Sequence, residues 1–184
     1  MIGNASFLHP AIGFLALALA LPFFRGTQWR WLLILPPVLA LWSMLTAEPG
    51  VYGVLPYLDE PLILGRVDKL SIIFGQVFAV IALAGMIYGM HVTDKMTHIS
   101  ASLYVAGGFG CVFAGDYITV FLFWELMSIG STFLVWARRK PEATAAGFRY
   151  FMYHTVGGLF LLAGLLLRYK AIGTFAFTHV DPMG

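Results

Sequence analysis

The run Gly115–Lys140 constrains the fold most, because it is an apolar stretch long enough to form a helix across a membrane. It carries one carboxylate well inside it, that of Glu125. In a helix that begins near Tyr117, Glu125 lies roughly 12–14 Å from the start, close to the middle of a bilayer about 30 Å thick. An ionised acid at that depth costs roughly 2.5–3.5 kcal/mol, so we interpret Glu125 as a functional group that needs a partner.

The composition agrees with a membrane protein. Of the 184 residues, 60% are hydrophobic and 11% are charged, against about 25% charged in soluble proteins, and the mean hydropathy is +0.84. The net charge of +2 is too small to suggest a nucleic-acid partner, and the lone Cys111 excludes a disulfide within the chain. We therefore expect an all-α integral membrane protein whose surroundings are the lipid bilayer.

The hydropathy pattern predicts a single membrane domain, 1–184, with about six transmembrane helices. The expected helices are 7–24, 29–46, 70–89, 98–115, 117–136 and 143–168, with an extramembrane loop at 47–69 and a tail at 169–184. Pro36-Pro37 should kink the second helix or delay its start. Three glycines of the fourth helix, Gly107, Gly108 and Gly110, should let another backbone approach closely.

The basic residues indicate an orientation. The turns after the first, third and fifth expected helices carry six Lys and Arg residues, whereas the opposite side carries four. Because basic residues favour the cytoplasmic side, this difference predicts that both termini lie outside.

Hydroxyl side chains share a helix face with Glu125. Ser128 and Thr132 follow it at helical spacing, so the three side chains form one stripe. Such a stripe can hold water and pass protons, whereas the alternative is that the small residues serve only helix packing.

Two basic side chains of the last helix are candidate partners of Glu125. Arg149 either pairs with an acid or extends to the membrane surface. His154 lies nearer mid-depth, where an imidazole either relays protons or holds a neighbouring helix by a hydrogen bond. Asp116 is most simply an N-terminal acid that complements the helix dipole.

Cofactor chemistry has no support in the sequence. No CxxC, HExxH, Walker-type or GxGxxG motif occurs, and the histidines are not placed to ligate a haem between facing helices. We expect neither a cofactor nor a metal in this chain.

Three ordered segments carry a family resemblance. They are VDKLSIIFGQVFAVIALAGMIYG at Val67–Gly89, FAGDYITVFLFWELMSIGSTFLV at Phe113–Val135 and AAGFRYFMYHTVGGLFLLAGLLLRYKAIGTFAF at Ala145–Phe177. Together they resemble the amino-terminal half of the antiporter-like subunits shared by respiratory complex I, Mrp-type sodium/proton antiporters and membrane-bound hydrogenases or formate hydrogenlyases. The WEL around Glu125 is the most specific piece.

The resemblance implies a role for Glu125. In that family the glutamate of this helix pairs with a lysine on the helix after next, so Glu125 would be the proton-handling acid. That lysine would lie beyond Gly184, and we expect another chain of a split subunit to supply the lysine-bearing helices. The alternative is a truncated or shortened accessory subunit. Position 149 holds Arg where many members have Lys, which implies an electrostatic role rather than proton donation.

These inferences predict a subunit of a multi-subunit complex in the inner (cytoplasmic) membrane that translocates protons, or sodium ions against protons. It would not be an enzyme alone, but would belong with other membrane subunits to a redox-driven NADH/quinone-type or hydrogenase-type oxidoreductase. Two alternatives stay open. One is a structural subunit that conducts nothing, and the other is a proton-flux partner of a non-redox uptake complex.

Overall fold

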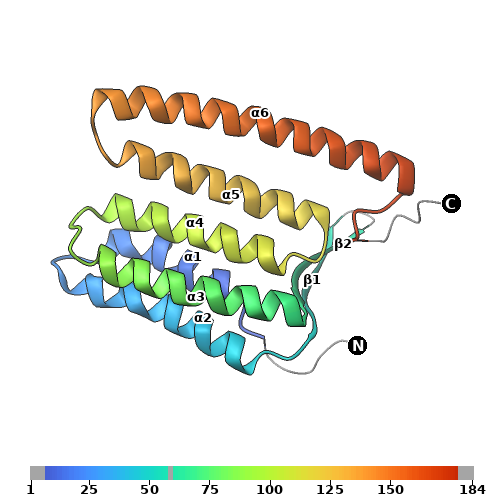
Figure 1. Cartoon of the computed structure of the whole chain (residues 1–184), viewed down its shortest axis with the longest axis horizontal. Coiled ribbons are helices and arrows are strands. Elements are labelled where there is room, and N and C mark those ends of the chain that lie inside the picture. Colours follow the sequence, from blue (N-terminus) through green and yellow to red (C-terminus); the bar gives the residue numbers. More distant parts are fainter. Residues whose placement is uncertain (1–6, 58–59, 178–184) are drawn as a thin grey trace.

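The computed structural model describes residues 7–57 and 60–177; the first six residues, residues 58–59 and the last part of the expected tail, 178–184, lie outside the described residues. Within the described part, six α-helices run side by side along the long axis, with a β-hairpin at one end (Figure 1). The helices are α1 (Pro10–Ala20), α2 (Leu35–Thr46), α3 (Lys69–Gly89), α4 (Lys95–Phe113), α5 (Tyr117–Trp136) and α6 (Pro141–Ile172). The strands are β1 (Gly50–Tyr57) and β2 (Glu60–Val67), and two short 3-10 helices, η1 (Leu21–Phe23) and η2 (Gln28–Ile34), connect α1 to α2.

Five helical segments of the described chain are long and apolar enough to cross a membrane, with η2 and α2 counted together as Gln28–Thr46. The all-α membrane class is thereby confirmed, with five such segments where about six were expected. The expected helix that is too short to be counted is the first one. Helix α1 has 11 residues, which rise only about 16 Å. Pro22 follows at the start of η1, and a proline without an N–H ends the α-helical hydrogen bonding there.

The connections differ in detail from the expected ranges. Pro36 and Pro37 occupy the first turn of α2, so the α-helix starts late, after η2. The expected loop 47–69 contains the antiparallel hairpin, which pairs Gly50 with Val67 and Leu55 with Leu62.

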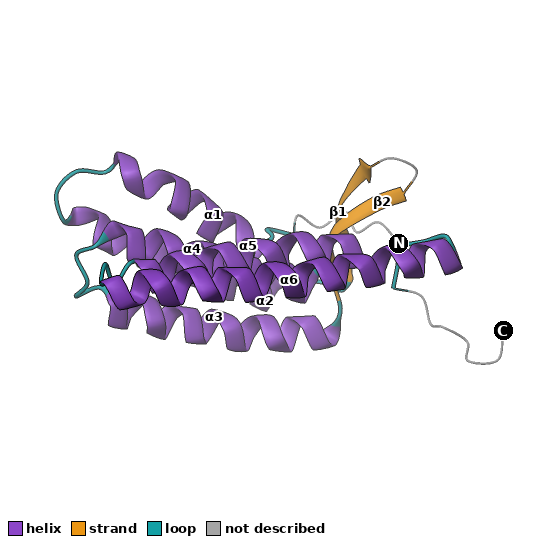
Figure 2. Cartoon of the chain, turned by 90° about the horizontal axis from the view of Figure 1, so that it is seen from above, coloured by secondary structure: helices purple, strands orange, loops and turns teal. Residues whose placement is uncertain are grey.

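Helix α4 lies at the centre of the bundle. It contacts α1, α3 and α5, and Figure 2 shows α1 and α3 on opposite sides of it. A Cβ on Gly107 would lie 2.8 Å from Met127 N of α5, and a Cβ on Gly130 of α5 would lie 2.7 Å from Tyr104 N of α4. Glycine therefore sets the close approach of α4 and α5, which confirms the expectation for Gly107.

Helix α6 lies at the edge of the bundle and packs on α5 (Figure 1). Its buried residues are Gly147, Gly158 and Leu165. Most of its remaining side chains are exposed or half-buried. One face of α6 is thus in contact with this chain, and the rest is available to lipid or to another subunit.

Asp116 joins the start of α5 to the hairpin. Its side chain is 1% exposed, and its Oδ2 accepts hydrogen bonds from Ile63 N (2.7 Å) and Thr119 Oγ1 (2.6 Å). Its Oδ1 accepts a third from Thr119 N (2.8 Å). The main chain adds a bond from Tyr117 N to Phe175 O at 3.0 Å. Asp116 is thus an N-terminal acid of α5 that also fixes the hairpin and the segment after α6.

We predict that Asp116→Ala lowers the free energy of unfolding by about 3 kcal/mol, because it leaves buried N–H and O–H donors without an acceptor. Reversible unfolding in mixed micelles, followed by circular dichroism, measures the change.

Asp94→Ala is the matched control. Asp94 precedes α4 at the opposite end of the bundle; it is half-buried, accepts a hydrogen bond from Thr97 Oγ1 at 3.1 Å and pairs with the exposed Arg139 at 2.9 Å. Such pairs contribute about 1 kcal/mol or less. Equal losses in the two variants would contradict the role given to Asp116.

Candidate functional site: the seam between α5 and α6

Helices α5 and α6 lie side by side (Figure 1), and the side chain of Glu125 on α5 faces α6. The residue is half-buried, and its Oε1 atom is buried without a hydrogen-bond partner among the described residues. Gly158 of α6 lies directly opposite, since a Cβ built there would come within 2.2 Å of Oε1. A buried carboxyl oxygen without a partner is unfavourable. The site is therefore one where a proton or a cation from outside the described residues would be stabilising.

One turn further along α5, Ser128 meets His154 of α6. Ser128 Oγ lies 3.2 Å from His154 Nδ1 and 3.0 Å from Trp124 O. The hydroxyl hydrogen can bond only one of these two acceptors at a time, so when it is on Trp124 O, Nδ1 is the donor to the serine oxygen. This pair can therefore exchange donor and acceptor roles, which is a requirement for passing a proton.

A third contact follows at the next turn. Tyr150 donates its hydroxyl hydrogen to Ser131 Oγ at 3.1 Å, and Ser131 Oγ donates to Ser128 O at 2.9 Å. The rings of Tyr150 and His154 lie 4.3 Å apart between centroids. The polar contacts thus continue along the seam from Ser128 towards the α5–α6 turn.

We call these three levels the seam ladder: Glu125 with Gly158, Ser128 with His154, and Ser131 with Tyr150. Successive levels are about one helical turn, roughly 5 Å, apart, a spacing that one water molecule can bridge. The sequence analysis did not single out Ser131, Tyr150 or Gly158. Tyr150 and Gly158 lie four residues before and after His154, so the i, i+4 rule applied to α6 would have found both.

The structure places the other two candidates away from Glu125. Thr132 is 2% exposed and donates its hydroxyl hydrogen to Ser128 O at 2.8 Å, within its own helix. Arg149 is exposed and forms no hydrogen bond or ion pair with Glu125. It precedes Gly158 by about 13 Å along the axis of α6. Neither side chain contacts Glu125, and the roles predicted for them stay predictions.

An open groove of about 560 Å³ lies beside the seam ladder. His154 lines it together with Trp124, Tyr153 and Gly157, and its remaining lining residues are Tyr117, Val120, Leu161 and Phe177. His154 thus contacts Ser128 and also faces the open side of α5 and α6. The imidazole therefore connects the seam ladder with this groove.

Within residues 7–57 and 60–177, no group of three or more His, Cys, Asp or Glu side chains is arranged to hold a metal ion. The chemistry that the seam supports is hydrogen bonding and proton transfer among carboxyl, hydroxyl and imidazole groups.

The chain has relatives among known membrane proteins. Residues 114–183 match the family model described as NADH:quinone oxidoreductase/Mrp antiporter, TM. The putative antiporter subunit mnhA2 of Staphylococcus epidermidis is 32% identical over 133 residues, which are 68% of this chain and 16% of that protein. NAD(P)H-quinone oxidoreductase chain 5 of Picosynechococcus sp. is 34% identical over 125 residues, 64% of this chain and 18% of that protein. The chloroplastic NAD(P)H-quinone oxidoreductase subunit 5 of Nephroselmis olivacea is 30% identical over 96% of this chain and 27% of that protein.

A solved structure shares the fold. One chain in the structure of the membrane-bound sulfane sulfur reductase, an archaeal respiratory membrane complex, superposes with a TM-score of 0.82 at 21% identity, over 92% of this chain and 28% of that chain. Residues 114–183 match the family of antiporter-like membrane subunits, and the relatives extend the similarity over most of the chain, which confirms the resemblance found in the sequence. It spans between 16% and 27% of the length of the three relatives named above.

Proposed function

We propose that this multi-pass membrane protein is an ion-translocating subunit of a multi-subunit complex in the cytoplasmic membrane, in which Glu125 takes up and releases a proton. The ion moved is a proton, or a sodium ion exchanged for protons. The observation that carries the proposal is the buried Oε1 of Glu125, which has no hydrogen-bond partner among the described residues and faces Gly158.

The proposed cycle follows from the cost of charge in the membrane. A protonated Glu125 is tolerated in an apolar seam, whereas the carboxylate needs a nearby cation. No described Lys or Arg forms an ion pair with Glu125, so we propose that the cation is a lysine on a helix outside this sequence, in an adjoining membrane subunit. Approach of the lysine releases the proton, and its withdrawal favours uptake of another.

The seam ladder is the proposed route for that proton. His154 and Ser128 can exchange donor and acceptor roles at 3.2 Å, and Ser131 and Tyr150 continue the polar contacts towards the α5–α6 turn. Glu125 lies about one helical turn beyond Ser128, a gap that one water molecule would bridge.

The experiment that tests the proposal is proton uptake by inverted membrane vesicles that carry the chain with Glu125→Gln, with the companion subunits identified and quantified by mass spectrometry. Loss of uptake with the companion subunits retained supports the proposal. Normal uptake in the variant would identify a structural subunit that conducts nothing.

A further inference from the structure

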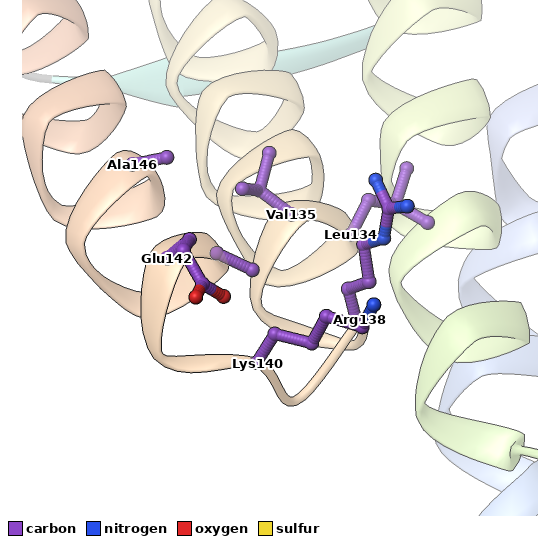
Figure 3. Close-up of a pocket in the computed structure, with 7 residues that line it drawn as sticks. Leu134, Val135, Arg138, Lys140, Glu142 and Ala146 are labelled. Atoms are coloured by element: carbon purple, nitrogen blue, oxygen red, sulfur yellow. The ribbon is translucent and has the colours of Figure 1, made fainter.

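A hollow of about 670 Å³ lies at the turn between α5 and α6 (Figure 3). This turn is at the far end of the bundle from the hairpin (Figure 1). Its walls are of two kinds. The apolar wall comes from both helices and consists of Leu134, Val135, Ala143 and Ala146. The charged wall comes from the turn and consists of Arg138, Lys140 and Glu142.

The three consecutive cations of the turn divide between two environments. Arg139 has a φ of +52°, and its guanidinium pairs with Asp94 before α4 at 2.9 Å. Arg138 and Lys140 line the hollow instead, and neither side chain forms a hydrogen bond or an ion pair with any described residue. In Figure 3 the side chain of Lys140 extends towards that of Arg138, whereas the carboxylate of Glu142 lies on the other side of the turn.

The charged wall carries two cations and one carboxylate, and neither cation is paired with a described residue, so the hollow keeps a net positive charge and is electrostatically suited to an anion. A free anion would gain nothing from Leu134 and Val135, which line the same space. A ligand that satisfies both walls has a negatively charged head and an apolar tail. The hollow lies at the ends of two helices that are long enough to cross a membrane. At that level of a membrane, lipids with a polar or charged head and an apolar tail surround the protein.

We propose that this hollow binds an anionic phospholipid, with its phosphate between Arg138 and Lys140 and an acyl chain along the apolar wall. Glu142 narrows the choice of head group. Its carboxylate repels a second phosphate, but it accepts a hydrogen bond from a hydroxyl group. A lipid with one phosphate and a glycerol head group, such as phosphatidylglycerol, therefore fits the hollow best.

Trp136 is a natural reporter for this site. Its Nε1 donates to Thr144 O of α6 at 3.2 Å, and a Cβ on Gly147 would lie 2.3 Å from the same nitrogen. The indole is thus held against α6 beside the hollow. Bromine atoms on a lipid acyl chain bound there would quench its fluorescence.

The test uses the full chain purified with its companion subunits, in bilayers of phosphatidylcholine with a variable fraction of brominated phosphatidylglycerol. The signal of Trp136 is the difference between this protein and its Trp136→Phe variant. Each cation near a membrane surface favours an anionic lipid about fivefold, so half-maximal quenching should need about 25-fold less brominated phosphatidylglycerol than brominated phosphatidylcholine.

Variants of the three cations distinguish a specific lipid site from a general attraction of anionic lipids to the basic turn. Arg138→Gln and Lys140→Gln should each weaken the preference about fivefold, and Arg138→Lys should restore most of it. Arg139→Gln is the matched control, because it removes the same charge from the same turn but from the side chain that pairs with Asp94. It should leave the preference unchanged.

Three outcomes overturn the proposal. Equal quenching by the two lipids in the unaltered protein shows that no anionic lipid is preferred. An equal effect of Arg139→Gln and Arg138→Gln shows diffuse attraction only. Displacement of the lipid by inorganic phosphate, but not by chloride of the same ionic strength, shows a site for free phosphate. Circular dichroism and recovery of the companion subunits verify that the variants fold. If a variant does not fold, the preference of the unaltered protein for brominated phosphatidylglycerol over brominated phosphatidylcholine tests the proposal.

Discussion

Glutamine in place of Glu125 is expected to lower the proton flux at least about 100-fold, which is the lower end of what a positioned acid or base contributes to proton transfer. The reason is chemical rather than steric. Glutamine fills the same volume opposite Gly158, but its amide neither takes up nor releases a proton. Fluorescence of a pH-sensitive dye in inverted vesicles measures the flux.

The control for this prediction is Glu48→Gln. Glu48 is exposed and lies between α2 and the hairpin, away from the seam ladder. The same chemical change there should leave the flux unaltered. Glu125→Asp adds a second comparison, because it keeps the titrating group and withdraws it from Gly158, so it should retain a measurable part of the flux. A flux in Glu125→Gln equal to that in Glu48→Gln would contradict proton handling by Glu125.

Alanine at position 158 is expected to lower the proton flux on the order of 10- to 100-fold, because a displacement of about 1 Å is enough to cause losses of this size in a reacting group. The added Cβ would lie 2.2 Å from Glu125 Oε1 and 3.2 Å from Glu125 Cδ. The carboxyl group is the end of a flexible side chain, so it can move without unfolding the helix pair. The variant should therefore assemble normally and fail in transport.

Gly157→Ala provides the matched control, since a Cβ on Gly157 meets no heavy atom within 4 Å. Both variants raise the helix propensity of α6 by the same amount, so their difference isolates the displacement of the carboxyl group. Vesicle assays of the two variants, with subunit recovery measured in parallel, give the comparison. If both variants transport equally well, the position of the Glu125 carboxyl group opposite α6 has no functional meaning.

The comparison of the two functional variants with Asp116→Ala separates transport from stability. Glu125 and Gly158 lie at the seam, whereas Asp116 holds α5 to the hairpin through Ile63 N at 2.7 Å. The first two variants should change flux at nearly constant stability. Asp116→Ala should lower stability first and lose flux only as the protein unfolds.

The class of protein, most helix positions and the acid at mid-length of α5 could all be predicted from the amino-acid sequence alone. Hydropathy and length are sufficient for this, because a helix in lipid satisfies its own backbone and must be apolar over about 20 residues. Helical spacing also placed Ser128 on the face of Glu125, and the WEL segment indicated the family that the comparisons confirm.

Which helix faces meet could not be predicted from the sequence and became clear only from the folded chain. Lipid and protein core are both apolar, so hydropathy does not reveal which side of α5 or α6 is buried, and periodicity within one helix does not fix the register between two. For this reason Gly158, rather than Arg149, lies opposite Glu125, and Tyr150 joins the ladder through Ser131. The same holds at the turn, where three consecutive cations are equivalent in sequence, but only Arg139 reaches Asp94.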